Sequence, residues 1–155
     1  MSIDGSASVV ASGAGTNIVT LQELTAGTAI ELGSGSTAGL DLSDTELNRV
    51  TADELQIGSS DAGAIAVTAN INPTSVTTLI LKGGALTDAA GVGITATNLS
   101  LQTTSATLDG VNSVGTLAGS VTGAFEYQDS GSVTIGTVDG VNGVSAGTTL
   151  SLIHI

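Results

Sequence analysis

The sequence contains no cysteine and no tryptophan, and only one proline, one phenylalanine and one tyrosine among its 155 residues. Without cysteine the chain has neither a disulfide framework nor a thiolate metal site. With so few aromatic rings, the core must be built from aliphatic side chains. Hydrophobic residues make up 41% of the chain, and this excludes an intrinsically disordered protein, because disorder requires low hydrophobicity and high charge.

Positive charge is also scarce, because Arg49 and Lys82 face fourteen acidic residues and the net charge is -12. Nucleic acid is excluded as a partner, since affinity for it comes mainly from Lys and Arg that neutralise phosphates. The same physics excludes binding to anionic membrane surfaces. The sequence has no apolar run of the ~18 residues that a membrane span needs, so no membrane insertion is expected. It does not open on a secretion signal, so we expect the signal of an exported parent protein to lie outside this segment.

Short stretches in which apolar and polar residues alternate recur along the whole chain and predict β-strands. The predicted strands are residues 17–22, 29–32, 39–42, 54–57, 64–71, 77–82, 93–102, 106–108, 120–127, 132–138 and 148–153. Alternation predicts one buried and one solvated face for each strand. The expected inward pairs are Leu55 and Ile57, Ile65 and Val67, Leu79 and Leu81, Leu99 and Leu101, Val133 and Ile135, and Leu150 and Leu152.

The segments between these strands are rich in Gly, Asn, Asp and Ser, which favour tight turns. The predicted turns are residues 33–39, 58–63, 82–93 and 128–132, and the tetrapeptide DGVN, which occurs at 109–112 and again at 139–142. A repeat of a few tens of residues is typical of stacked architectures, in which each coil buries its apolar layer against the next. The sequence therefore predicts an all-β chain that forms a parallel β-helix, or β-solenoid.

An antiparallel β-sandwich is the alternative fold, because Asp-Gly is a hairpin signal and occurs in both DGVN copies. The repeat favours the solenoid. One helical turn is expected between Ser43 and Leu55, where Ser43 and Glu46 have the spacing of a capping box.

Few residues suggest chemistry. The densest acidic group is Asp41, Asp44, Glu46, Asp53 and Glu54 beside Arg49. β-Helical enzymes that cleave polysaccharides use clustered carboxylates with a cation, but one Arg among flexible acids defines no constellation, and we interpret the group as a solvated corner. The only histidine, His154, lies next to the last residue with no acid or nucleophile nearby in the sequence.

No catalytic, cofactor or metal residues are therefore predicted. Calcium is disfavoured because DGVN offers two side-chain ligands per copy. The residues predicted to touch a ligand, if any do, are Phe125 and Tyr127, which alternation places on one face of their strand. The simpler interpretation is that both rings fill a local gap.

Three segments together resemble the repeat region of filamentous-haemagglutinin-type large exoproteins, the two-partner-secreted adhesins of Gram-negative bacteria. They are SGSTAGLDLSDTELNRVTADELQIGSSDAGAIAVTANI (34–71), TTLILKGGALTDAAGVGITATNLSLQT (77–103) and SGSVTIGTVDGVNGVSAGTTLSL (130–152). The resemblance implies a long right-handed parallel β-helix that is exported through an outer-membrane partner and is held on the cell surface or released. In that case residues 1–155 are a single uncapped segment, with a less regular start at 1–33, haemagglutinin-like repeats at 34–152 and a frayed or truncated end at 153–155.

The expected function is that of a structural stalk without enzymatic activity in a secreted or surface adhesin. Other parts of the parent protein would contact host or neighbouring cells. The alternatives are a fragment of a polysaccharide-acting β-helical enzyme and a filament subunit that self-associates end to end through unpaired strand edges.

Overall fold

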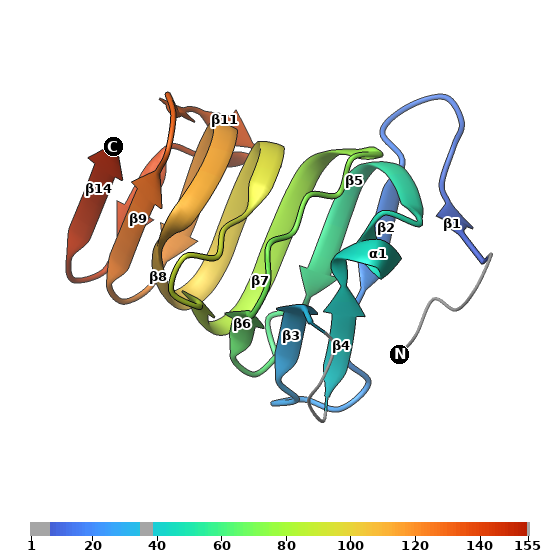
Figure 1. Cartoon of the computed structure of the whole chain (residues 1–155), viewed down its shortest axis with the longest axis horizontal. Coiled ribbons are helices and arrows are strands. Elements are labelled where there is room, and N and C mark those ends of the chain that lie inside the picture. Colours follow the sequence, from blue (N-terminus) through green and yellow to red (C-terminus); the bar gives the residue numbers. More distant parts are fainter. Residues whose placement is uncertain (1–6, 35–38, 155) are drawn as a thin grey trace.

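The computed structural model describes residues 7–34 and 39–154, and the chain is all-β, with 60% of its residues in strands and 3% in a helix. Figure 1 shows the strands side by side along the long axis of the molecule. In chain order the elements are β1 Val9–Val10, β2 Ile18–Leu21, β3 Ile30–Gly33, β4 Leu40–Ser43, α1 Asp44–Leu47, β5 Val50–Gly58, β6 Ile65–Val67, β7 Val76–Asp88, β8 Thr95–Val121, β9 Phe125–Asp129, β10 Thr134–Ile135, β11 Thr137–Val138, β12 Val141–Asn142, β13 Val144–Ala146 and β14 Leu150–His154.

The main sheet is parallel, and from β6 to β9 its pairing joins residues about twenty positions apart. Leu79 of β7 lies beside Leu99 of β8, and Leu86 of β7 lies beside Ala106, in each case twenty residues further along the chain. The sheet runs in the order β14, β9, β8, β7, β6, β3, β4, with β5 beside β7. The strands β7, β8 and β9, which follow one another in the chain, are therefore neighbours in a parallel sheet, and the predicted all-β class with parallel strands is confirmed.

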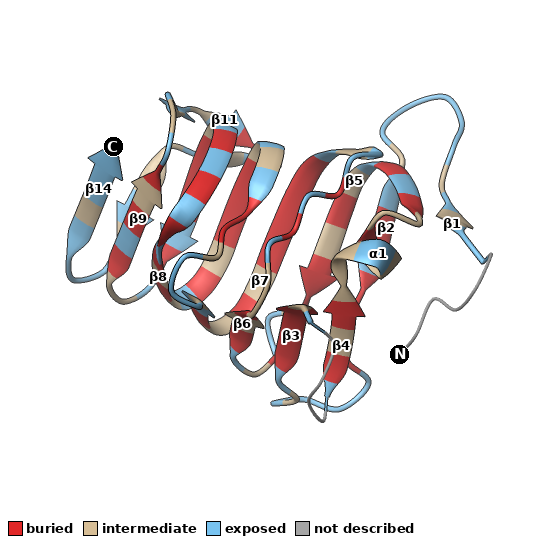
Figure 2. Cartoon of the chain, in the orientation of Figure 1, coloured by how far each residue is buried: buried red, intermediate tan, exposed pale blue. Residues whose placement is uncertain are grey.

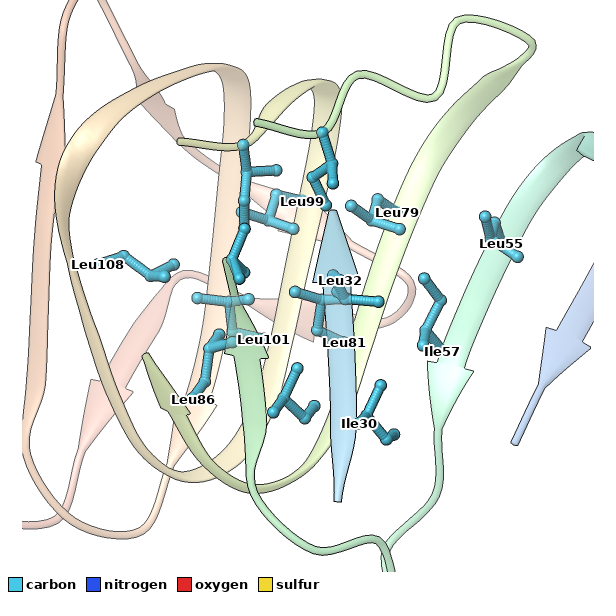
Figure 3. Packing of buried hydrophobic residues seen from close by; sticks show 14 of the residues in the cluster. Ile30, Leu32, Leu55, Ile57, Leu79, Leu81, Leu86, Leu99, Leu101 and Leu108 are labelled. Atoms are coloured by element: carbon cyan, nitrogen blue, oxygen red, sulfur yellow. The ribbon is translucent and has the colours of Figure 1, made fainter. Parts of the chain in front are cut away.

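The core consists of aliphatic side chains stacked in rows across these strands (Figure 3). One row runs Leu55, Leu79, Leu99 and a second runs Ile57, Leu81, Leu101, and all six side chains are buried. A third row begins at Leu40 and passes through Ile30, Ile65, Leu86 and Ala106 to Phe125. Burial of each large aliphatic side chain contributes about 1.5–3 kcal/mol, so the rows hold the coils together.

The inward orientation that the sequence predicts is confirmed for Leu55, Ile57, Ile65, Val67, Leu79, Leu81, Leu99 and Leu101, all of which are buried. Val133 is partly buried. The prediction is wrong for Ile135, Leu150 and Leu152, which are 42%, 52% and 44% exposed. These residues follow the buried Leu117, Phe125 and Tyr127 in register. They are exposed because, within residues 7–34 and 39–154, no strand covers that side of them.

The opposite end of the stack is covered. β4 is the last strand of the sheet on that side, yet Leu40 and Leu42 are buried, and so is Leu47 of α1. The predicted capping box is confirmed, because the Ser43 side chain accepts a hydrogen bond from the Glu46 backbone N–H while Glu46 accepts from Ser43. The inward side chains at this end therefore pack against the chain itself, which differs from the uncapped end that the sequence suggested.

One of the predicted turns is wrong, and another holds only in part. Residues 82–88 continue β7, and DGVN at 109–112 continues β8. The second DGVN forms a tight antiparallel hairpin between β11 and β12, with positive φ at Asp139 and Gly140. Part of the predicted turn at 33–39, residues 35–38, lies outside the described residues.

Candidate functional site

Asp44 and Glu46 of α1 have different hydrogen-bond partners. Asp44 Oδ1 accepts a hydrogen bond of 2.7 Å from the backbone N–H of Asn72, and the Asn48 side chain accepts from Thr74. Glu46 is occupied by the capping box with Ser43. Asp44 and Asn48 therefore fasten α1 to the chain segment that precedes β7, and Glu46 closes the first turn of the helix.

Asp53 and Glu54 lie next to each other in β5 but have different surroundings. Asp53 Oδ2 accepts two hydrogen bonds of 2.8 Å, one from the backbone N–H and one from the side-chain N–H of Asn17. The bond from the backbone N–H is the main reason that the pKa of Asp53 lies below its usual value. The pKa of Glu54 is raised, first by partial burial and then by the charges of Asp139 and Asp53. Within residues 7–34 and 39–154, no group of three or more His, Asp or Glu side chains could hold a metal ion.

A buried polar cluster lies inside the coil instead, at Asn112, Tyr127 and Asp129. Asp129 Oδ2 accepts hydrogen bonds from the Tyr127 hydroxyl at 2.6 Å and from the Val114 backbone N–H at 3.0 Å, and its Oδ1 accepts from the Gly131 N–H at 2.8 Å. Burial raises the pKa of the Tyr127 hydroxyl strongly, and the hydrogen bond and charge of Asp129 add to the effect.

Asn112 ties three neighbouring segments together. Its Oδ1 accepts from the Ile94 backbone N–H at 2.9 Å, while its Nδ2 donates to the carbonyl oxygens of Leu108 and Gln128. The side chain is fully buried and its polar atoms are used, so it acts as an internal bracket between coils. Sequence reasoning placed both Asn112 and Asp129 in turns and missed this cluster, although Asp129 stands two residues after Tyr127 and so shares its face.

Phe125 and Tyr127, the predicted ligand-contact residues, point into the coil and are both buried. Their rings are stacked with centroids 6.3 Å apart. Phe125 follows the small Ala106 in its row, and its ring lies so near Gly119 that a Cβ there would be 3.2 Å from it. Small neighbours therefore make room for the ring, and in this arrangement neither ring presents a face to solvent.

The β11–β12 hairpin packs on the outer side of the sheet. Val138, Ile80 and Ala118 are buried but stand outside the main core cluster, and β11 and β12 both contact β8. Gln102 Nε2 donates to Asp139 Oδ2 at the tip of the hairpin, at 3.2 Å. We interpret the hairpin as a cover over the outward-facing Ile80.

Two open hollows lie on the described surface. One has a volume of about 410 Å³ and is lined by Asn72, Pro73, Thr74, Val76, Thr95, Ala96, Thr97, Ser113 and Gly115. The other, of about 300 Å³, is lined by Gln22, Glu23, Leu24, Thr25, Thr28, Gly39 and Leu40. Neither of these two linings includes an aromatic ring or a cationic side chain. His154 is exposed on β14, beside Asp129 of β9 in register.

The only helix in the described residues, α1, is far too short to cross a membrane. Comparisons of the chain with protein-family models, with curated proteins and with solved structures found no match.

Proposed function

We propose that the chain forms a right-handed parallel β-helix and serves as a structural stalk segment of a secreted bacterial surface adhesin. The observation that carries this proposal is the continuity of the inward rows. From β6 to β9, each row joins residues that are about twenty positions apart in the sequence. Right-handedness is the general rule where parallel strands of one sheet are joined by a crossover.

The use of the polar residues supports a structural role. Asn112 and Asp129 bond neighbouring segments inside the coil, and Asp44 and Asp53 accept backbone hydrogen bonds from other segments. A carboxylate pair that acts on a glycosidic bond needs both groups aimed at one substrate position. Asp44 and Asp53 are aimed at separate backbone partners, the N–H groups of Asn72 and Asn17, which favours the stalk over the enzyme.

In this proposal the chain spaces other parts of a parent protein from the cell. Those parts would contact host or neighbouring cells, and an outer-membrane partner would export the whole. These roles follow from the resemblance to filamentous-haemagglutinin-type exoproteins, and the low positive charge and the ring-free surface agree with a segment that itself binds little.

A length experiment tests the stalk. Residues 79–98 form one complete coil, because Leu79 and Leu99 are neighbours in register, so their duplication adds one coil without a shift of any row. Small-angle scattering should show a maximum dimension larger by about 4.8 Å per added coil, with an unchanged cross-section. A thicker particle or an unfolded one would contradict the β-helix.

A display experiment tests the function itself. The chain is placed on a bacterial surface between an anchor and a binding module, with the anchor alone and the anchor plus the chain as controls. The doubled-coil variant should improve the module's access to its target, and the chain without the module should bind no more cells than the anchor alone. Cell binding by the chain alone, or release of reducing sugars from polysaccharides by the purified chain, would overturn the proposal.

A further inference from the structure

The second DGVN copy belongs to a loop that is extruded from one coil of the stack. Ile135 of β10 lies beside Leu117 of β8, and Val144 of β13 lies beside Gly119, so the ladder advances by two residues on one side. Residues 136–143 stand between these two pairs and leave the coil as the hairpin that contains β11 and β12. Insertions of this kind project from one face of a repeat architecture.

The tip of the hairpin, Asp139–Gly140, is exposed and lies over strands in the middle of the sheet. Both residues have positive φ, 48° and 71°, as a two-residue turn of type I′ requires. Gln102 of β8 donates to Asp139 Oδ2, and the charge of Asp139 acts on Glu54 of β5. A Cβ added to Gly140 would meet no atom within 4 Å, and in residues 7–34 and 39–154 the Gly140 N–H finds no hydrogen-bond acceptor. The peptide nitrogen that follows Asp139 is therefore accessible and unrestrained.

The first DGVN copy has the same sequence in the opposite environment. Asp109 and Gly110 lie within β8, along which Figure 2 shows alternate buried and exposed residues. The Gly110 N–H donates to Asp88 Oδ2 at 3.0 Å, and a Cβ on Gly110 would lie 1.7 Å from the Val92 carbonyl oxygen. The peptide nitrogen that follows Asp109 is therefore bonded and enclosed by the neighbouring coil.

The pair Asn142–Gly143, at the base of the hairpin, lies between these two cases. A Cβ on Gly143 would also meet no atom within 4 Å. The Gly143 N–H, however, donates to the Gly136 carbonyl oxygen at 2.8 Å, and Asn142 Oδ1 accepts from the Thr137 hydroxyl at 2.7 Å. The backbone nitrogen and the side-chain amide are both held by the hairpin itself.

An aspartate that precedes glycine reacts with its own backbone, because glycine has no side chain to hinder ring closure. The peptide nitrogen of Gly140 attacks Cγ of the protonated Asp139 carboxyl group, and the N–Cγ bond forms while one carboxyl oxygen leaves as water with the peptide proton and the carboxyl proton. Water then adds to one of the two carbonyls of the five-membered imide and breaks one C–N bond, which gives either aspartate or isoaspartate. The reaction is intramolecular, so its rate depends on how easily the two groups reach each other.

We propose that Asp139 is a site of spontaneous isoaspartate formation in the folded chain, whereas Asp109 in the same tetrapeptide is protected. Isoaspartate adds one carbon atom to the backbone of a two-residue turn, and the turn fixes the register of its hairpin. The pairing of Val138 with Val141 is then lost, and the buried Val138 is withdrawn from the outer face of the sheet. The modification therefore releases the hairpin as the protein ages. This inference rests on the hairpin alone and stands whether or not the chain is an adhesin stalk.

Prolonged incubation of the full chain at neutral pH, once folded and once in urea, tests the proposal. A glutamate-specific protease separates the two copies, because they lie on either side of Glu126. Chromatography then resolves the isoaspartate forms of each peptide, and fragmentation in a mass spectrometer locates the modified residue. In the folded chain isoaspartate should form at least about tenfold faster at Asp139 than at Asp109, whereas in urea the two rates should be about equal, because the local sequence is the same.

Asp139→Asn gives a matched comparison within the hairpin. Asn-Gly also suits a type I′ turn, and asparagine closes the same ring with loss of ammonia in place of water. In the folded variant deamidation at position 139 should be at least about tenfold faster than at Asn142, whose neighbouring N–H is bonded, and in urea the two rates should be about equal. Hydrogen exchange of residues 137–142 should be faster in the modified wild-type chain than in the fresh one. A smaller rate ratio for either pair in the folded protein, or unchanged exchange after modification, would overturn the proposal.

Discussion

The hydrogen bond between Tyr127 and Asp129 allows a sharp test of the interior. Tyr127→Phe removes the hydroxyl that donates to Asp129 Oδ2 at 2.6 Å but keeps the ring. Asp129 keeps its bonds from the backbone of Val114 and Gly131. Loss of one hydrogen bond to a charged group costs about 1.5–3 kcal/mol. In a chain of this length that lowers the melting temperature by roughly 3 to 12 °C.

The same hydroxyl sets the stability at alkaline pH. Burial keeps the Tyr127 phenol protonated in the folded chain, because it raises the pKa above the ordinary value of 10.0. In the unfolded chain the phenol releases its proton above about pH 10, so the unfolded state then binds fewer protons than the folded state. The free energy of unfolding of the wild type should therefore fall by about 1.4 kcal/mol per pH unit above pH 10 relative to that of Tyr127→Phe. Below pH 10 the difference in free energy between the two proteins should not change with the ionisation of Tyr127.

Urea unfolding followed by circular dichroism, at pH 8 and at about pH 11, measures this difference between the two proteins. Because the chain has one tyrosine and no tryptophan, ultraviolet absorbance reports the phenolate of Tyr127 without interference. The phenolate should appear only as the chain unfolds. Phenolate absorbance near pH 10 in a chain that keeps its folded circular dichroism would refute the reasoning, and so would equal stability of Tyr127→Phe and wild type at pH 8.

Two further predictions concern packing. Ile57→Asp should abolish folding or cost several kcal/mol of stability, because it places a carboxylate inside a buried row. Ile135→Asp, at a position that is 42% exposed, should cost less than about 1 kcal/mol. Equal effects of the two substitutions in thermal melts would contradict the core assignment. Gly110→Ala should cost about 1–3 kcal/mol or more, because its Cβ would lie 1.7 Å from the Val92 carbonyl oxygen. Gly131→Ala, whose Cβ would be 3.7 Å from its nearest neighbour, should melt within a few degrees of wild type.

Alternation in the sequence was enough to predict the rows, because the side-chain period of a strand holds wherever one face is buried. It identified Leu79, Leu81, Leu99 and Leu101 without knowledge of their partners. Alternation alone does not say whether a strand has neighbours on both sides, and for that reason Leu150 and Leu152 were predicted buried.

Glycine was the main source of error. Gly83 and Gly84 were taken as turn residues, but they lie in β7, where a Cβ on either would come within about 3 Å of the Gly63 carbonyl oxygen. The neighbouring coil requires their small size, and a single sequence does not distinguish this requirement from positive φ. The two DGVN copies show the same limit, because Asp139 and Gly140 adopt positive φ and form a hairpin while Asp109 and Gly110 remain extended.

The interior polar cluster was only partly predictable. The inward position of Phe125 and Tyr127 follows from their shared face, and a core of aliphatic rows has room for rings only beside small residues such as Ala106 and Gly119. The partners of Asn112 come from β9 and from the segment before β8, and their contact depends on the register between coils. That register cannot be obtained from local sequence.

The central claim, that segments twenty residues apart lie side by side in parallel, is tested most directly by a disulfide between Thr87 and Thr107. The two residues are partners in register, and neighbouring strands are about 4.8 Å apart, within the span of a disulfide. Thr87→Cys with Thr107→Cys should form an intramolecular bond on mild oxidation and gain up to about 3 kcal/mol of stability. Thr87→Cys with Thr97→Cys, ten residues apart and not paired, should remain reduced. A reduced first pair, or oxidation of the second pair instead, would contradict the stacked arrangement.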